Sequence, residues 1–372
     1  MHYSLSELLL HFRQPAGTSR GIYLTRRSWL VRLSDGEREG VGECAPLPDL
    51  SCDAMPDEQY VAILREMCQR YVDTAEIPYE ALRPYPSMLF GLETAVASLT
   101  GSAPFNGSTA FSRGERGIPI NGLVWMGTFD EMYRRIQEKL QAGFHCVKLK
   151  IGAIDWQREI ELIRFIRQHF TKEQIELRVD ANGGFTPEEA LSKLRQLSQY
   201  DIHSIEQPIK ADGGGSRIPS PTPPKQEGTM RDARCEVRGA RWSEMARLCR
   251  ETPLPIALDE ELIGVNDPKE KKALLDTIRP HYIILKPSLH GGMSGCREWI
   301  ALARKRGIGS WVTSALESNI GLNAIALFAA EMYEGQGEMM YQGLGTGQLF
   351  TDNIPMSLEI RGEQLWRLAR FR

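Results

Sequence analysis

From about Gly117 onward, short apolar segments rich in β-branched residues alternate with amphipathic stretches that have the helical period. Strands that alternate with helices in this way are typical of a parallel sheet, and seven such units favour a closed barrel over an open sheet. The expected strands are residues 118–125, 145–151, 175–181, 202–206, 255–259, 281–286 and 308–313. The expected helices include residues 129–142, 155–169, 187–199, 242–250 and 294–306.

The chain before Gly117 has a different pattern. Residues 21–33 and 37–43 predict a β-hairpin around Ser34-Asp35-Gly36, and a third early strand is possible near Leu8. Helical segments are expected at 58–72 and 87–99. We therefore expect an α+β capping domain.

These patterns predict three parts of the chain. The capping domain covers residues 1–116, and the barrel that carries the catalytic residues covers 117–345. The tail, 346–372, includes an alternating strand-like segment at 356–368, and we expect the tail to return to the capping domain.

One segment, residues 210–237, interrupts the rhythm of the barrel. It contains GGGSRIPSPTPPKQEG, which has too little apolar content to bury a core. Asp180 and Glu206 are 26 positions apart, whereas Glu206 and Asp259 are 53 apart. Since one βα unit takes roughly 30 residues, the longer spacing indicates one unit plus a surface insertion. A lid over the active face and a disordered segment are both open, and we expect disorder.

Composition narrows the function. A net charge of −3 gives no basic field for nucleic acid, and no apolar run is long enough to span a membrane. The seven cysteines contain no C-x-x-C pair, which argues against a zinc module or a disulfide framework and favours a reducing cytoplasm. The histidines also lack metal-ligand spacing. Any bound metal would therefore be held by carboxylates, which suit a hard ion such as Mg²⁺, Mn²⁺ or Ca²⁺.

Charged residues stand at five successive strand ends of the expected barrel. They are Lys148 and Lys150, Asp180, Glu206, Asp259 and Lys286. In a barrel, such C-terminal strand ends meet at one rim. Three acids on neighbouring strands would repel one another unless a cation lay between them.

The two lysine-bearing strands are four apart in a ring of eight. Lys150 and Lys286 should therefore face each other across the mouth, and Lys148 shares a strand face with Lys150. This arrangement suits removal of a proton next to a carboxylate, since a metal stabilises the charge that develops on the carboxyl oxygens. A lone strand-end Asp often only caps a helix, but the ordered set on five strands favours catalysis.

The motifs VKLKIG, RVDANGGF, IEQP, ALDEEL and LKPSLHGG stand in order along the chain. Together they resemble the enolase superfamily, specifically its muconate-lactonizing subgroup, whose members use a Lys or His base with Mg²⁺. The resemblance implies an α/β fold, a modified TIM barrel of the (β/α)7β type with an N-terminal α+β capping domain. The residue roles that it implies are Mg²⁺ ligation by Asp180, Glu206 and Asp259 (with Mn²⁺ as a possible substitute), acid/base catalysis by Lys150, an opposing Lys286, modulation by Lys148, and support of the metal site by Asn182 and Glu260.

Four further stretches, GVGECAPLPDLS, PSMLFGLETAVASL, TSALESNIG and GLGTG, resemble the o-succinylbenzoate synthase family within that subgroup. This resemblance implies dehydration of 2-succinyl-6-hydroxy-2,4-cyclohexadiene-1-carboxylate to o-succinylbenzoate in menaquinone biosynthesis. Ser314, Gly343 and Gly345 then lie in loops that contact this small-molecule carboxylate. Arg178 either contacts the dicarboxylate substrate or pairs with a buried carboxylate. The oligomeric state stays open.

Three alternatives remain at this stage. Racemisation of N-acylamino acids or epimerisation of dipeptides would use Lys150 and Lys286 as two bases, although the Asp-x-Asp typical of dipeptide epimerases is absent from residues 343–347. A muconate-cycloisomerase-like reaction could use the same scaffold. A barrel that binds without catalysis is the third alternative, and the intact set of acids and lysines argues against it.

Overall fold

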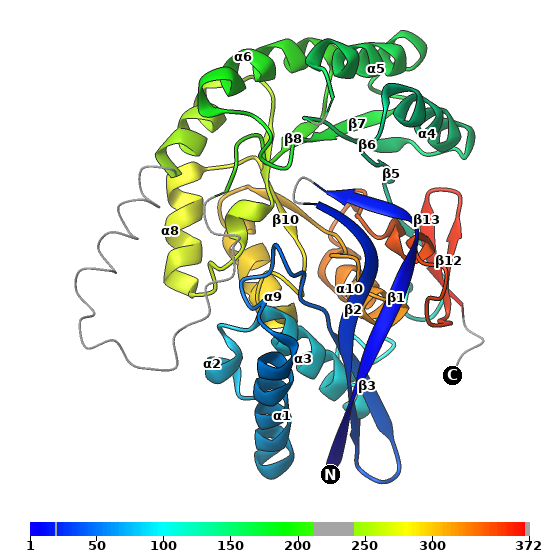
Figure 1. The fold of residues 1–372 in the computed structure, drawn as a ribbon, viewed down its shortest axis with the longest axis vertical. Coiled ribbons are helices and arrows are strands. Elements are labelled where there is room, and N and C mark those ends of the chain that lie inside the picture. Colours follow the sequence, from blue (N-terminus) through cyan, green and yellow to red (C-terminus); the bar gives the residue numbers. More distant parts are fainter. Residues whose placement is uncertain (19–20, 153, 212–241, 369–372) are drawn as a thin grey trace.

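The computed structural model describes residues 1–18, 21–152, 154–211 and 242–368 (Figure 1). Of the expected insertion at 210–237, all but Lys210 and Ala211 lies outside these ranges. No helix in the described ranges is both long enough and apolar enough to cross a membrane.

The N-terminal part is an antiparallel sheet covered by helices. Its strands, in the order β1-β2-β3, are β1 (His2–Thr18), β2 (Gly21–Ser34) and β3 (Glu39–Cys44). The expected hairpin around Ser34-Asp35-Gly36 and the early strand near Leu8 are both confirmed. The helices are α1 (Asp57–Thr74), α2 (Tyr79–Leu82) and α3 (Pro86–Thr100), and both expected helical segments are confirmed.

Strand β3 and helix α3 approach each other unusually closely. A Cβ added at Gly42 would lie 1.9 Å from the carbonyl oxygen of Gly91, and one added at Gly91 would lie 2.1 Å from Cys44 Sγ. The glycines of GVGEC therefore serve close packing rather than a turn. This contact places Glu43 on β3 and Glu93 on α3 beside the barrel.

The second part is a curled parallel sheet with helices around its outside (Figure 1). Each strand falls within an expected segment, so the parallel α/β architecture is confirmed. The seven strands, in order, are β5 (Gly122–Val124), β6 (Cys146–Lys150), β7 (Glu176–Asp180), β8 (Ser204–Glu206), β9 (Ile256–Leu258), β10 (Tyr282–Leu285) and β11 (Gly309–Val312). The helices are α4 (Phe129–Gln141), α5 (Trp156–His169), α6 (Pro187–Leu197), residues 242–251, α8 (Pro268–Ile278), α9 (Gly292–Arg304) and α10 (Asn319–Tyr333).

Between β5 and β11, where an eighth strand would close the barrel, the structure has no full strand among the described residues. In the part of the chain that the structure describes, two isolated bridges close this gap, Ile120 with Gln342 and Thr313 with Gly343. The next residues form a 3-10 helix, η3 (Gly345–Leu349). A Cβ at Gly343 would lie 2.2 Å from Thr313 Oγ1, so glycine lets this short segment abut β11. This segment thus forms one bridge to the chain just before β5 and one to the residue after β11 before the 3-10 helix begins.

The C-terminal tail contacts both parts of the molecule. Phe350 bridges to Phe12 in β1, and the backbone N–H of Thr351 donates to the carbonyl oxygen of His11 at 2.9 Å. The tail then forms a hairpin from β12 (Leu358–Arg361) and β13 (Gln364–Arg367), and β13 pairs with β4 (Ile118–Pro119) at the start of the barrel. The exact domain limits at 116 and 345 stay a prediction.

Candidate active site

The strand ends bring the expected charged residues to one rim of the curled sheet. Lys150 lies opposite Asp180 in the β6–β7 register, and Asp180 lies opposite Glu206 in the β7–β8 register. Asp259 directly follows β9, and Lys286 directly follows β10. Because the side chains of parallel strands alternate between faces, these groups share the inner face.

Lysine amines contact all three acids. Lys150 Nζ donates to Asp180 Oδ2 at 2.6 Å, and Lys148 Nζ lies 2.8 Å from the same oxygen. Lys148 also contacts Glu206, and Lys286 contacts Asp259. Asp180 and Asp259 are fully buried, so these contacts balance charges that water does not reach.

Lysine charges control the ionisation of two of the acids. At Asp180, burial acts to raise the pKa, but the charges of Lys148 and Lys150 outweigh burial and lower it. At Asp259, burial is likewise outweighed, here mainly by Lys286, and the pKa is lowered. Both acids are therefore held as carboxylates by the amines that contact them.

Glu206 has the opposite shift. Burial, followed by the charge of Asp180, raises its pKa well above the usual range. Lys148 lies between these two acids, and although burial acts to lower its pKa, the charges of Asp180 and Glu206 raise it. One ammonium thus contacts two acids, and at Glu206 its charge does not outweigh burial and the charge of Asp180.

Three buried oxygens at the rim lack a hydrogen-bond partner among the described residues: Glu206 Oε1, Asp259 Oδ1 and Glu260 Oε2. Within the same part of the chain, no group of three Asp, Glu, His or Cys side chains is arranged to hold a metal ion, and lysine amines contact the acids at the rim. The donor chemistry nevertheless fits Mg²⁺, which prefers hard carboxylate oxygens and keeps open positions.

Asn182 links the lysine of one strand to an acid further along the rim. Its Oδ1 accepts from Lys150 Nζ at 2.6 Å, and its Nδ2 donates to Glu260 Oε1 at 2.9 Å. Its backbone N–H donates to Asp180 Oδ1 at 3.0 Å. Asn182 therefore holds Lys150, Asp180 and Glu260 in one hydrogen-bonded group.

Gln207 is a supporting residue that the sequence reasoning missed. It is fully buried, and its Oε1 accepts the backbone N–H groups of Asp259 at 3.3 Å and Glu261 at 3.1 Å. It thereby fixes the backbone on which Asp259 is carried. Its position directly after Glu206, in the motif IEQP, was the available signal.

Arg178 does not line the pocket. Its Nε donates to Glu176 Oε1 at 2.6 Å, and its Nη1 donates to the carbonyl oxygen of Tyr341 at 2.9 Å. Its guanidinium carbon lies 4.2 Å from the centroid of the Trp311 ring. Trp311 does line the pocket, so Arg178 acts on the pocket only by packing against the ring of Trp311.

A cavity of about 610 Å³ opens at this rim. Lys148, Lys150 and Lys286 line it, as do Glu206 and Glu260. The three loop residues expected from sequence also line it: Ser314, Gly343 and Gly345. A cavity of this size with a few polar groups suits a small ligand.

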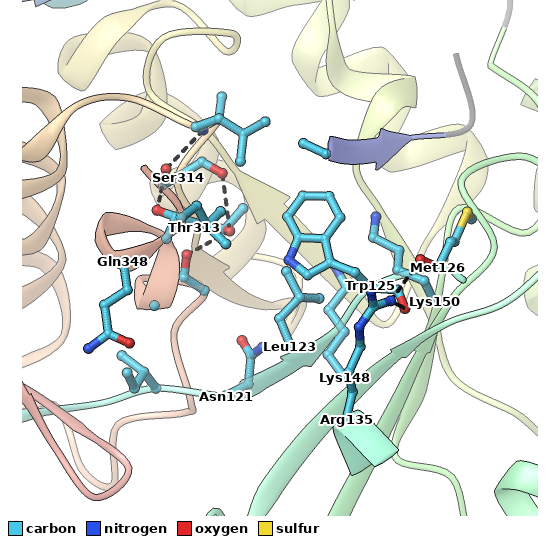
Figure 2. Close-up of a pocket in the computed structure, with 18 of the residues that line it drawn as sticks. Asn121, Leu123, Trp125, Met126, Arg135, Lys148, Lys150, Thr313, Ser314 and Gln348 are labelled. Atoms are coloured by element: carbon cyan, nitrogen blue, oxygen red, sulfur yellow. Dashed lines mark hydrogen bonds between the residues drawn. The ribbon is translucent and has the colours of Figure 1, made fainter. Parts of the chain in front are cut away.

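The walls of the cavity come from both parts of the molecule. Residues 12–16 of β1 contribute one side, together with Leu47 and Leu50. Figure 2 shows Trp125 projecting into the pocket between Ser314 on one side and Lys150 on the other. The apolar wall residues, such as Leu47 and Trp125, had no distinct signal in the sequence, because burial against a ligand and burial in a core look alike there.

Ser314 is held by its neighbours. Its hydroxyl donates to Glu317 Oε2 at 2.7 Å and accepts from Thr346 Oγ1 at 2.8 Å. Its backbone N–H donates to the carbonyl oxygen of Gly343 at 3.1 Å. The loop after β11 and the loop at Gly343 thus form one wall.

Two family models match the chain. The model described as "Enolase C-terminal domain-like" matches residues 131–217, and "MenC, N-terminal domain" matches residues 19–99. The o-succinylbenzoate synthase of Desulfotalea psychrophila is 41% identical over 97% of both chains. That of Edwardsiella ictaluri is 27% identical over 84% of this chain and 80% of its own length.

Solved structures of related proteins have a similar fold. The crystal structure of MenC from Desulfotalea psychrophila matches with a TM-score of 0.75 and 38% identity, covering 98% of this chain and 99% of that one. Muconate lactonizing enzyme from Pseudomonas putida matches with a TM-score of 0.74 at 18% identity, covering 98% and 93%. A dipeptide epimerase from Enterococcus faecalis matches with a TM-score of 0.77 at 17% identity, covering 98% and 96%. The last two matches show the shared fold alone.

Gln207→Leu should destabilise the protein, because it removes the acceptor of two buried backbone N–H groups. We expect the free energy of unfolding to fall by about 3 kcal/mol, measured by urea denaturation. Gln336→Leu, at an exposed position, is the control and should change it little. An unchanged unfolding midpoint in Gln207→Leu would show that Gln207 does not support Asp259.

Proposed function

The chain belongs to the o-succinylbenzoate synthase family of the enolase superfamily, and we propose that its rim residues carry out the dehydration for which that family is named. The substrate is 2-succinyl-6-hydroxy-2,4-cyclohexadiene-1-carboxylate, and the products are o-succinylbenzoate and water. One observation carries the assignment of roles. Lys150 and Lys286, on or directly after strands four places apart in the sheet, line one cavity with buried carboxylates between them.

Lys150 is the acid/base residue in this proposal. In its neutral form, Nζ takes the proton from the carbon next to the ring carboxylate, and the electron pair moves toward that carboxylate. The resulting ammonium then gives its proton to the departing hydroxyl group, which leaves as water. The lysine thus returns to its starting form, and the product ring is aromatic.

Lys286 stays protonated on the other side of the ring. Its ammonium, which contacts Asp259, stabilises the negative charge of the intermediate and lies toward the π face of the ring. Lys148 holds Asp180 and Glu206 through its contacts with both. Asn182 and Glu260 keep Lys150 and Asp180 in place.

Asp180, Glu206 and Asp259 would hold Mg²⁺, with Mn²⁺ as a possible substitute. When bound, the ion supplies positive charge to the carboxylate oxygens on which negative charge develops. Support comes from the unpartnered oxygens of Glu206 and Asp259. A dipeptide epimerase from Cytophaga hutchinsonii, which shares the fold, was crystallised as a complex with Mg and a dipeptide.

Ser314, Gly343 and Gly345 form the wall that contacts the remainder of the substrate, a small-molecule carboxylate. We place the enzyme in the cytoplasm, where thiols stay reduced. The free thiols of Cys44, Cys68 and Cys296 support a reducing compartment.

Turnover of the cyclohexadiene substrate tests the proposed function directly. With Mg²⁺ present, the wild-type protein should form o-succinylbenzoate, followed by the appearance of the aromatic absorbance. Lys150→Ala should lose at least about a thousandfold in kcat, because no other group replaces the acid/base. Lys272→Ala, at an exposed lysine of α8 that does not line the cavity, is the control and should keep the wild-type activity. Full activity in Lys150→Ala would refute the role of Lys150.

Metal binding can be measured without turnover. Isothermal calorimetry should show Mg²⁺ binding to the wild type and a loss of at least about tenfold in affinity for Glu206→Gln. Glu176→Gln changes an acid that pairs with Arg178 instead of lining the pocket, and its affinity should match the wild type. Equal affinities in all three proteins would place the ion elsewhere.

Racemisation of an N-acylamino acid is a second candidate, because both lysines line the same cavity. Two opposed bases would exchange the α-hydrogen of either enantiomer with solvent. Incubation in D₂O with an N-acylamino acid, followed by proton NMR, measures this exchange. Loss of the α-proton signal from both enantiomers would establish the second activity, and an unchanged signal would exclude it.

A further inference from the structure

Two glutamates of the N-terminal part reach across to the barrel and cap the starts of two barrel helices. Glu43 lies at the end of β3 and Glu93 lies in α3, and both are almost completely buried. The first N–H groups of a helix have no partner within the helix and attract negative charge. Each glutamate supplies that charge from a distant part of the chain.

Glu43 caps α10. Its Oε1 accepts from the backbone N–H of Ser318 at 3.0 Å and from Ser28 Oγ at 2.8 Å. Its Oε2 accepts from Ser318 Oγ at 2.5 Å and from the backbone N–H of Gly321 at 2.9 Å. All four donors converge on one carboxylate, so the start of α10 is fixed to β3.

Glu93 caps α9 in the same way. Its Oε2 accepts from the backbone N–H of Met293 at 2.6 Å, and its Oε1 accepts from that of Ser294 at 3.1 Å. The residue before the helix, Gly291, offers no side-chain cap. Glu93 therefore supplies the hydrogen-bond acceptor that a capping side chain at Gly291 would otherwise provide.

A glycine makes room for each carboxylate. A Cβ added at Gly321 would lie 2.8 Å from Glu43 Oε2 and 2.7 Å from Glu317 Cβ. One added at Gly292 would lie 2.3 Å from Glu93 Oε2. Gly321 lies inside α10, where glycine is otherwise unfavourable, so this position serves the approach of Glu43. Gly292 is the first residue of α9 with φ of 70°, so glycine there suits the backbone as well as the approach of Glu93.

The two capped helices follow loops with different roles. The loop before α10 lines the pocket with Thr313, Ser314, Ala315 and Leu316. The segment between β10 and α9 contributes Lys286 alone to the lining. The cap of α10 thus lies directly behind a wall of the pocket, whereas the cap of α9 lies behind a segment that turns away from it.

A second contact from the same sheet fixes the α10 loop. Arg26 Nε donates to the carbonyl oxygen of Leu316 at 3.1 Å, and Arg26 is almost fully buried. Leu316 has φ of 66°, a conformation that a leucine adopts only when its surroundings impose it. The N-terminal sheet therefore holds the wall at Leu316 and again at Ser318.

We propose that Glu43 is a positioning residue for substrate binding, which sets the 314–318 wall of the pocket from across the domain boundary. Glu93 makes an equivalent cap and has no such effect on the pocket. This inference rests on the proposed function, because it assigns the wall that contains Ser314 to the substrate.

Steady-state kinetics of Glu43→Gln and Glu93→Gln form the test. Glutamine has one carbonyl oxygen, so in Glu43→Gln either Ser318 or Gly321 is left with its N–H facing an NH₂ group. We expect the KM of Glu43→Gln to rise about tenfold while kcat changes less than about threefold, because the wall binds substrate and takes no part in the chemistry. Glu93→Gln should keep the wild-type KM, and thermal unfolding should show that both variants lose stability.

Gly321→Ala provides a second variant in case Glu43→Gln fails to fold. Alanine in place of glycine ordinarily stabilises a helix, and φ at Gly321 is not in the left-handed region. We nevertheless expect a raised KM, because the added methyl group displaces the Glu43 carboxylate and also presses on Glu317, which accepts from Ser314. A KM equal to the wild type would count against the proposal.

Two results separate this inference from the proposed function. Wild-type turnover together with equal KM values in Glu43→Gln and Glu93→Gln would overturn the role of Glu43 alone. A wild type that neither turns over the substrate nor binds o-succinylbenzoate in calorimetry would overturn the proposed function, and the role of Glu43 with it.

Discussion

Three carboxylates that are buried at neighbouring strand ends have to be electrically balanced, and the rest of the site depends on how this is done. An unpaired charge in such a place costs on the order of several kcal/mol. Here three amines supply the balance, two from β6 and one directly after β10. The hydrogen bonding of these acids is incomplete, since Glu206 and Asp259 each keep a buried oxygen without a partner among the described residues. A rim that is held together by lysines and still has free carboxylate oxygens is suited to take up a divalent cation.

The N-terminal part completes the pocket around this rim. The barrel supplies apolar wall residues such as Trp125 and Leu316, and β1 together with Leu47 and Leu50 supplies a further part of the wall. The two parts are joined by buried polar contacts, in which Glu43, Glu93 and Arg26 hold the barrel loops. Such contacts are directional, so they fix where a loop lies as well as how tightly the parts adhere. The residues that join the two parts therefore also fix the position of the pocket wall.

Much of the fold could be predicted from the sequence, because it depends on local periodicity. The strands of the barrel and the N-terminal hairpin were predicted from apolar patterns, and the structure has strands at those residues. The charged strand ends could be predicted for the same reason, since Asp180 and Glu206 end their strands. The (β/α)7β resemblance implies an eighth strand, and among the described residues its place is taken by two isolated bridges, at Gln342 and Gly343. The caps could not be predicted, because Glu43 bonds to a residue 275 positions away and Glu93 to one 200 positions away.

A crystal structure with Mg²⁺ and o-succinylbenzoate would test the central claim most directly. We predict the ion among Asp180, Glu206 and Asp259, with the product carboxylate beside it and the amines of Lys150 and Lys286 on opposite faces of the ring. An ion bound elsewhere, or both amines on the same face of the product, would contradict the proposed mechanism.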